Sequence, residues 1–305
     1  MTTVDSTDTT TAADSTDTMT AADASDTTAT AGTTATADST DTMTAADASE
    51  AAGAGGFGAA ITTAYSDALA GAYDEIYPST PDLDDIGTYL LTLTSPGASV
   101  LELGVGTGRV AIPLAERGFD VHGVETSEGM LARLAEKDPE GRVTPVHGDF
   151  SGLDLGRTFD VVLAPFNVLC CAMAVDEQIA LTHAMARHVA ADGHVVIETF
   201  DPSDYHVQKK NEVNTYPIGA RGALIESVGV LPASQNMMLQ STLFLDGDAP
   251  RSATTVMRYV WPGELDLLGA IAGLELVGRY AGWREQPFDG GDSRKMCVSV
   301  FRPLA

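Results

Sequence analysis

Apolar and polar positions in the middle of the chain alternate between short buried runs and amphipathic segments of helical period. The first apolar run, Ser99–Leu103, reads SVLEL and leads into a cluster of glycines. The pattern predicts strands at 99–103, 120–124, 143–147, 159–164 and 194–200, and helices at 109–117, 127–137 and 176–190. Such an alternation is typical of a parallel sheet covered by helices on both faces.

The rhythm changes near residue 220. Three strand-like runs follow one another without helices, which predicts an antiparallel meander inserted at about 220–261; the runs are 222–230, 237–246 and 254–261. A helix is expected at 263–272, and two last strands at 274–283 and 295–301 are joined by a loop rich in Gly, Pro and Asp. A hairpin is the shortest connection there, so we expect the final strand to run antiparallel to the rest of the sheet.

The segment ahead of the first strand has a helical pattern. ITTAYSDALAGAYDEIY at 61–77 carries Tyr65, Tyr73 and Tyr77, and Pro78 ends it. A second helix is expected at 82–93. Residues 57–98 are therefore interpreted as a helical segment that precedes a domain at 99–305.

Residues 1–56 differ from everything that follows. ADSTDTMTAADAS occurs at 13–25 and again at 37–49. Apart from Met19 and Met43 these copies hold no large apolar residue, so stacked repeats would have nothing to bury. The composition predicts a disordered acidic tail, with a docking or solubilising role as the alternative.

Charge and cysteine content narrow the function classes. The chain has 43 acidic and 17 basic residues, a net charge of -26, and no Lys or Arg before Arg109. Phosphate and membrane-surface binding need clustered Lys and Arg, so neither nucleic acid nor a membrane is an expected partner. The N-terminus has neither the basic n-region nor the apolar h-region of a secretory signal, and the chain has no 18-residue apolar run that could form a membrane-spanning helix. The three cysteines, Cys170, Cys171 and Cys297, cannot all pair in disulfides. We therefore expect a reducing cytoplasm and no metal framework.

A glycine-rich turn and the ends of successive strands supply candidate chemistry. Three glycines open a helix directly after the first strand, where backbone amides can approach a ligand; they are Gly104, Gly106 and Gly108. Glu125 ends the second strand and can accept the hydroxyls of a ribose. Asp149, after the third strand, can reach an adenine amino group, with Phe150 beside the ring. The spacing G-x-G-x-G departs from the dinucleotide fingerprint, which disfavours a nicotinamide-dependent dehydrogenase.

Four segments together carry a family resemblance: VLELGVGTGRVAIPLAERG, VHGVETSEGML, HGDF and FDVVLAPFNVL. Over residues 57–303 the chain resembles the class I S-adenosylmethionine-dependent methyltransferases. The resemblance implies a Rossmann-like α/β fold: a seven-stranded sheet with a reversed last strand, the small antiparallel insertion and a helical N-terminal lid at 57–98.

The same resemblance implies S-adenosylmethionine as the cofactor and assigns its contacts. Glu102 and the three glycines would surround its methionine part, and Glu125 would hold its ribose. The adenine side would be formed by Thr126, Met130, Asp149 and Phe150. Phe166 and Asn167, after the fourth strand, would lie near the sulfonium.

Within that superfamily the meander resembles small-molecule methyltransferases of secondary metabolism, including sugar N,N-dimethyltransferases. We therefore expect methyl transfer to an N or O nucleophile of a small molecule or natural-product scaffold. One alternative is methylation of the terminal amine of a ribosomally made peptide, and another is a non-catalytic binding protein that keeps the cofactor cleft. A homodimer is compatible with each of these readings.

An amine nucleophile must be neutral to react, and a free alkylamine has a pKa of about 10, so a proton acceptor is expected near it. Candidates lie in TFDPSDYH after the fifth strand: Asp201, Asp204, Tyr205 and His206. His206 is the preferred base, with an ordinary surface histidine as the alternative. Tyr73 in AYDEIYP is the candidate lid residue, with packing against Tyr65 and Tyr77 as the alternative.

Overall fold

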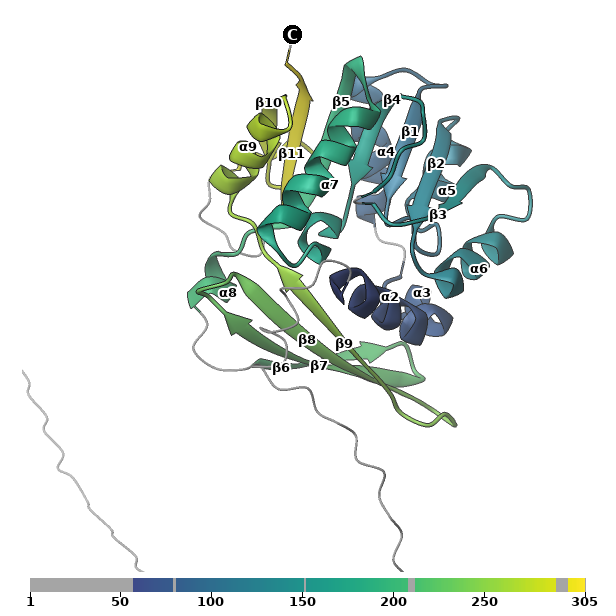
Figure 1. The fold of residues 1–305 in the computed structure, drawn as a ribbon. Coiled ribbons are helices and arrows are strands. Elements are labelled where there is room, and N and C mark those ends of the chain that lie inside the picture. The colour runs from purple at the N-terminus through teal and green to yellow at the C-terminus, as the bar shows by residue number, and fades with distance from the viewer. Residues whose placement is uncertain (1–56, 79–80, 151, 208–211, 289–295, 305) are drawn as a thin grey trace, which may run out of the picture. The chain divides into compact units, whose positions relative to one another are not determined.

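The computed structural model describes residues 57–78, 81–150, 152–207, 212–288 and 296–304. The repetitive segment at 1–56, expected to be a disordered tail, lies outside these ranges. Two sheets organise the described part: a seven-stranded sheet and a four-stranded antiparallel sheet (Figure 1). None of the helices in the described ranges is long and apolar enough to cross a membrane.

The larger sheet has the order β10-β11-β5-β4-β1-β2-β3. Its strands are β1 (Ser99–Leu103), β2 (Asp120–Glu125), β3 (Val143–His147), β4 (Phe159–Ala164), β5 (Val189–Phe200), β10 (Leu274–Tyr280) and β11 (Met296–Pro303). β11 pairs antiparallel with both β5 and β10, which confirms the reversed last strand. The chain leaves β1 toward β2 and β3 on one side and toward β4 and β5 on the other. The crevice at such a switch point is where open parallel sheets bind ligands.

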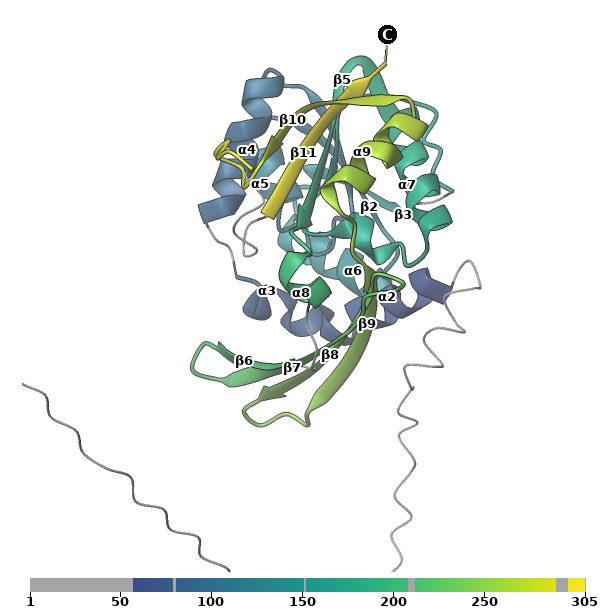
Figure 2. The same cartoon turned by 90° about the vertical axis from the view of Figure 1, so that its left-hand side faces the viewer.

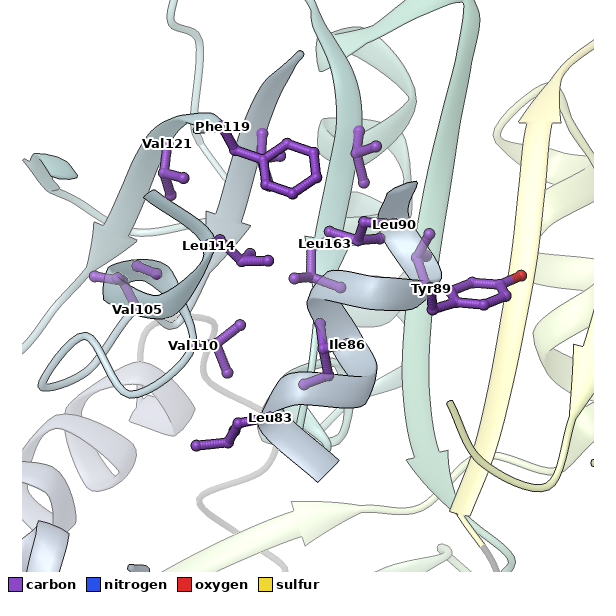
Figure 3. Packing of buried hydrophobic residues seen from close by; sticks show 14 of the residues in the cluster. Leu83, Ile86, Tyr89, Leu90, Val105, Val110, Leu114, Phe119, Val121 and Leu163 are labelled. Carbon is purple, nitrogen blue, oxygen red and sulfur yellow. The ribbon is translucent and has the colours of Figure 1, made fainter. Parts of the chain in front are cut away.

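Helices cover both faces of this sheet. α4 (Pro81–Leu93), α5 (Ala111–Glu116) and α6 (Glu128–Lys137) pack on one face, and α7 (Val175–His188) and α9 (Pro262–Ile271) pack on the other. Figure 3 shows the first core, where Ile86 and Leu90 of α4 meet Leu163 of β4. Leu163 faces this core while Val162 faces the opposite one, because successive strand residues point to opposite faces. Each such fully buried side chain contributes about 1.5–3 kcal/mol.

The four-stranded sheet is one strand larger than the predicted meander. Its strands are β6 (Glu212–Ile218), β7 (Gly222–Leu231), β8 (Asn236–Leu245) and β9 (Arg251–Arg258), paired in that order. The expected boundary near 220 misses β6. This edge strand buries only Ile218, while Val213 and Tyr216 are exposed, so it lacks the apolar alternation that marks a half-buried strand.

The predicted helix at 61–77 is broken into α2 (Phe57–Leu69), a 3-10 turn at Ala70–Ala72 and α3 (Tyr73–Ile76). Leu69 and Ala72 pack against Leu224 and Leu243 of the small sheet. Figures 1 and 2 both show α2 and α3 between the two sheets. The segment 57–78 is therefore anchored through an apolar core of its own.

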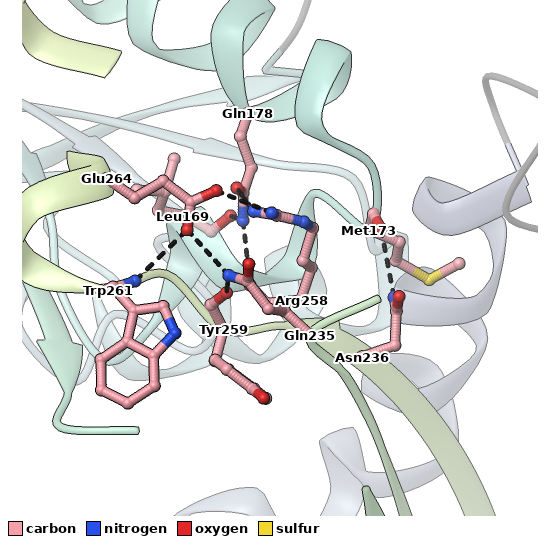
Figure 4. Close-up of polar contacts among 9 residues, drawn as sticks. All are labelled: Leu169, Met173, Gln178, Gln235, Asn236, Arg258, Tyr259, Trp261 and Glu264. Atoms are coloured by element: carbon pink, nitrogen blue, oxygen red, sulfur yellow. Dashed lines mark hydrogen bonds and ion pairs between the residues drawn. The ribbon is translucent and has the colours of Figure 1, made fainter. Parts of the chain in front are cut away.

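Buried polar contacts join the small sheet to α7 and α9 (Figure 4). Arg258, at the end of β9, donates to Gln178 Oε1 at 2.5 Å and to Glu264 Oε1 at 2.7 Å. Gln178 Nε2 donates back to the Arg258 carbonyl at 2.9 Å. Arg258 is only 6% exposed, and a buried charge is tolerated when it is paired and hydrogen-bonded in this way. These contacts around Arg258 fix the position of the small sheet relative to α7 and α9.

Two connections differ from the sequence-based expectation. β5 begins at Val189, directly after α7, although the helix was expected to reach residue 190 and the strand to begin at 194. Val189 pairs with Phe159 before a register shift, and this tertiary pairing draws the residues into the sheet. A short helix, α8 (Ser203–Val207), follows β5, where no helix was predicted.

Candidate active site

The glycine-rich turn lies at the carboxyl end of β1, beside the end of β2. Gly104, Gly106 and Gly108 have φ values of 68°, 55° and 81°, which side chains rarely adopt. A Cβ at Gly108 would collide with Leu134, so this glycine lets α6 approach the turn. A Cβ at Gly106 would meet nothing nearer than the Gly104 carbonyl oxygen at 3.9 Å. The space beside Gly106 is therefore open, as a ligand that contacts the backbone requires.

Glu102 lies two residues before Gly104, in β1. It is 1% exposed, and its Oε2 has no hydrogen-bond partner among the described residues. Burial raises its pKa well above the usual range; Arg109 opposes this rise and Glu125 adds to it. A buried carboxyl oxygen without a partner is costly unless a ligand satisfies it. The ammonium of an amino acid moiety is a suitable chemical partner for this oxygen.

Glu125 ends β2 and faces the turn. Its Oε1 accepts the backbone N–H groups of Thr126 at 2.9 Å and Ser127 at 3.0 Å. Its Oε2 accepts the N–H of Gly106 at 3.1 Å. A carboxylate has about four acceptor sites, so Oε2 retains one for a hydroxyl group. The strand-end acid is thus oriented by backbone amides in the way a ribose site needs.

Thr126 and Met130 lie on the β2–α6 connection. Ser127 caps α6, since its Oγ accepts the N–H of Met130 at 3.0 Å. Met130 is buried with 2% exposure. The Thr126 hydroxyl accepts a hydrogen bond from Thr63 of α2 at 2.8 Å. This predicted adenine-side segment is therefore in contact with the lid.

Asp149 and Phe150 follow β3, which pairs parallel with β2, so they lie near the end of β2. Asp149 is exposed, and Phe150 is partly buried against the core on the α7 side. The tip of the Phe150 ring lies 3.9 Å from the position that a Cβ on Gly104 would occupy. The aromatic ring predicted for adenine thus borders the glycine-rich turn.

Phe166 and Asn167 follow β4 with a strained backbone. Their φ values are 48° and 66°, uncommon for residues with side chains. The strain is held from β5: Glu198 Oε2 accepts the Phe166 N–H at 2.7 Å, and Asn167 Oδ1 accepts the Phe200 N–H at 2.8 Å. The Arg109 guanidinium lies 4.0 Å from the Phe166 ring centroid, a cation–π geometry. This contact ties Phe166 to the glycine-rich turn.

Three tyrosines of the segment 57–78 lie close together, and the Arg109 guanidinium after the turn lies 5.8 Å from the Tyr77 ring centroid. Tyr65 and Tyr77 hydroxyls lie 3.3 Å apart, and the Tyr73 and Tyr77 ring centroids are 4.9 Å apart. Burial raises the pKa of Tyr73 to about 12, Arg109 opposes the rise, and Tyr65 and Glu125 add to it. Tyr73 therefore lies within electrostatic reach of the turn and of the ribose-site acid. Its ring also packs on Tyr77, the contact expected from the packing alternative, and the lid role of Tyr73 stays a prediction.

Two acidic residues of the segment 57–78 accept hydrogen bonds from residues at the glycine-rich turn and on α6. Asp74 Oδ1 accepts from the hydroxyl of Thr107 at 2.7 Å and from Lys137 Nζ at 2.9 Å. Asp67 accepts a very short hydrogen bond from Ser127 and a further one from the Gly129 N–H at 3.3 Å. Both acids thus contact segments that flank the turn or follow Glu125.

His206, the candidate base, lies on α8. Its Nδ1 is 2.6 Å from the Tyr259 hydroxyl, and its ring packs edge-on against Tyr259 and Trp261. Figure 1 shows α8 well apart from α3, at the other end of the small sheet. Asp201, another candidate in this segment, is buried and accepts from Ser203. The structure therefore gathers the predicted cofactor residues and Tyr73, and it places His206 in a separate aromatic cluster. No group of His, Cys, Asp or Glu residues suited to a metal ion occurs in the described ranges.

Several residues at the site were not singled out from the sequence. Arg109 packs on Phe166, Glu198 positions the Phe166 backbone, and Glu226 and Ser241 of the small sheet face the lid tyrosines. Arg109 had a weak signal, because it follows the last glycine of the turn. Glu226 had none, since its neighbours across the sheet and on the lid are distant in the chain.

Comparison with known proteins agrees with this geometry. A family model described as a methyltransferase domain matches residues 100–193. The cypemycin N-terminal methyltransferase of a Streptomyces species is 31% identical over 209 residues, covering 68% of this chain and 84% of that protein. A dTDP-3-amino-3,6-dideoxy-alpha-D-glucopyranose N,N-dimethyltransferase of Streptomyces fradiae is 30% identical, covering 44% and 54% respectively. The structure of the CcbJ methyltransferase from Streptomyces caelestis superposes with a TM-score of 0.73 at 36% identity, covering 80% of this chain and 99% of CcbJ.

Proposed function

The chain belongs to the class I S-adenosylmethionine-dependent methyltransferases, and we propose that it methylates an amine nitrogen of a small natural-product scaffold. The family settles the reaction class and the cofactor. The nitrogen acceptor is our inference, supported by relatives that are named as N-methyltransferases and by the acidic, tyrosine-rich surroundings of the site.

The residues of this chain fit the cofactor. Glu102, whose Oε2 is unpartnered, would hold the ammonium, and the open backbone at Gly106 would lie along the methionine part. Glu125 would accept a ribose hydroxyl, and Thr126, Met130, Asp149 and Phe150 would flank adenine. When bound, S-adenosylmethionine supplies a methyl group activated by its sulfonium. No further chemical activation is required from the protein.

The work left to the protein is alignment, exclusion of water and control of the acceptor's proton. Tyr73 and Tyr77 cover the turn, and we propose that Tyr73 closes the site over the cofactor. Phe166 and Asn167, held from β5, would form the wall near the sulfonium. An alkylammonium must lose its proton before it can attack, so a base or a bound water is needed close to the nitrogen.

We retain His206 as a candidate for that base. His206→Ala should reduce turnover far more than affinity for S-adenosylhomocysteine. The Tyr259 hydroxyl partners His206 Nδ1, so Tyr259→Phe is the matched variant that alters the histidine without removing it. Unchanged turnover in His206→Ala would remove this assignment.

The observation that carries the cofactor site is the buried Glu102 with an unpartnered oxygen beside the open glycine turn. The proposal is tested with calorimetric titration of S-adenosylhomocysteine, followed by incubation of cofactor with aminosugar and amino acid amines. We expect binding and a mass gain of about 14 or 28 Da per acceptor, one or two methyl groups replacing hydrogen. Failure to bind S-adenosylhomocysteine at about 1 mM would overturn the proposal.

The second candidate acceptor is the terminal amine of a ribosomally made peptide. It is favoured by the similarity to the cypemycin N-terminal methyltransferase, which covers 84% of that protein. Competition between a short unblocked peptide and an aminosugar in one reaction separates the two acceptors. The sequence-based expectations of a homodimer and of a cytoplasmic location are part of this proposal, and light scattering of the purified chain tests the first.

A further inference from the structure

The small sheet presents a buried carboxyl group to the lid tyrosines. Glu226 of β7 is 9% exposed and pairs across the strands with Ser241 of β8, which is fully buried. Ser241 Oγ donates to Glu226 Oε1 at 3.0 Å. Leu224 and Leu243, two residues away on the same strands, belong to the core that packs against α2. Glu226 therefore points to the face of the sheet that the lid covers, because residues i and i+2 share a face.

Glu226 lies near Tyr65 and Tyr77, whose hydroxyls are 3.3 Å apart. Burial raises the pKa of Tyr65, hydrogen bonds to Tyr77 and Ser241 oppose the rise, and the Glu226 charge adds to it. Burial likewise raises the pKa of Tyr77, with Glu226 contributing. The Tyr73 ring is tilted by 53° against the Tyr77 ring, and burial raises the pKa of Tyr73, with the Glu125 charge adding to the rise. The tyrosines thus interact electrostatically with Glu125 of β2 and with Glu226 of the small sheet.

Within the described ranges, no Lys, Arg or His forms an ion pair with Glu226. A buried carboxylate without a cation is unfavourable for folding, and such groups cluster at functional sites. A carboxylate with the hydroxyls of Ser241, Tyr65 and Tyr77 nearby matches an alkylammonium, which gains charge pairing and hydrogen bonds there.

We infer that Glu226, with Ser241, Tyr65 and Tyr77, binds the ammonium group of the acceptor substrate. This inference rests on the proposed function, since it assigns the residue that recognises the amine. The small sheet then supplies substrate recognition directly, through a carboxyl group oriented by Ser241. An acceptor in which a neutral hydroxyl replaces the ammonium lacks the charge that Glu226 pairs with.

The test uses the full chain saturated with S-adenosylhomocysteine, and cyclohexylamine and cyclohexanol as probes of similar shape. Wild-type protein should bind the amine at least about tenfold more tightly than the alcohol, because charge-assisted hydrogen bonds are the stronger class. Glu226→Gln keeps the volume and removes the charge, so it should lose this preference while its affinity for S-adenosylhomocysteine stays unchanged. Glu212→Gln, an exposed acid on β6 of the same sheet, is the matched control and should behave as wild type.

Thermal unfolding provides the second readout. A Glu226 that only supports the fold would lower Tm when replaced, whereas an unpaired ligand-binding acid predicts an unchanged or higher Tm in Glu226→Gln. Equal amine binding by Glu226→Gln and wild type, no amine preference in wild type, or a marked drop in Tm would each overturn the inference. Failure of wild type to bind S-adenosylhomocysteine would instead overturn the proposed function, so the two failures are distinguishable.

Discussion

Replacing Glu125 by alanine tests how the cofactor site is built. In the structure the Glu125 carboxylate accepts N–H groups from Gly106 at 3.1 Å, Thr126 at 2.9 Å and Ser127 at 3.0 Å. Glu125 is only 7% exposed, so water screens its charge little and the carboxylate interacts mainly with these amides. Truncation removes both the ribose acceptor and the group that orients the glycine-rich turn.

The expected loss follows from one hydrogen bond between a ribose hydroxyl and a carboxylate, about 1.5–3 kcal/mol. The dissociation constant of S-adenosylhomocysteine should therefore rise about 10- to 150-fold in Glu125→Ala. The free energy of unfolding should fall as well, because three amides lose their acceptor. Isothermal titration calorimetry measures the first effect and urea denaturation the second.

Glu128→Ala is the matched control, since Glu128 is exposed at the start of α6, three residues further along. It should leave both quantities unchanged. If Glu125→Ala does not fold, Glu125→Gln keeps one acceptor oxygen for Thr126 and Ser127 and still removes the charge. A folded variant that binds S-adenosylhomocysteine within about threefold of wild type would refute the ribose assignment.

Burial raises the Glu102 pKa, so its contribution to stability is present below the ordinary value of 4.5 and lost as pH rises through the raised value. S-adenosylhomocysteine carries an ammonium, so it should bind more tightly as pH rises, and its binding should release the proton of Glu102. Calorimetry in buffers of different ionisation enthalpy should show this release, and Glu102→Gln should abolish it. Arg258→Ala should lower the free energy of unfolding by about 3 kcal/mol in urea denaturation, because a buried charge pair is broken, while the exposed Arg302→Ala should change it by less than about 0.5 kcal/mol. Asp74→Asn should speed release of S-adenosylhomocysteine about two- to fivefold in stopped-flow, since a partly exposed ion pair contributes up to about 1 kcal/mol; an unchanged off-rate would show that this contact does not hold the lid.

The larger sheet and the cofactor residues could be predicted because their signals are local. Glu102, the glycines and Glu125 sit at fixed positions relative to strand ends, and parallel strands bring those ends together. The reversed last strand followed from the shortness of a hairpin and is confirmed. The roles of the individual site residues stay predictions, although the structure brings them to one crevice.

The residues proposed to bind the acceptor could not be predicted, because they come together only through contacts between segments distant in the chain. Glu226 looks like any polar strand residue until Ser241 and Tyr65 are seen beside it. β6 was not predicted, because an edge strand that buries one side chain shows no alternation of apolar and polar residues. The sequence offered His206 as a candidate base, but the direction of α8 and the contact of His206 with Tyr259 depend on tertiary packing.

The apolar core between the lid and the small sheet has a consequence for how acceptor preference can change. Leu69 and Ala72 of the lid fit against Leu224 and Leu243, although the two segments are far apart in the chain. A transplant of residues 212–258 from a relative would therefore need the matching lid face. It would also need partners for Arg258 at the joint. The segment 57–78 and the small sheet should therefore be exchanged together. Chimeras that exchange both should change the acceptor preference and leave cofactor binding by the larger sheet intact.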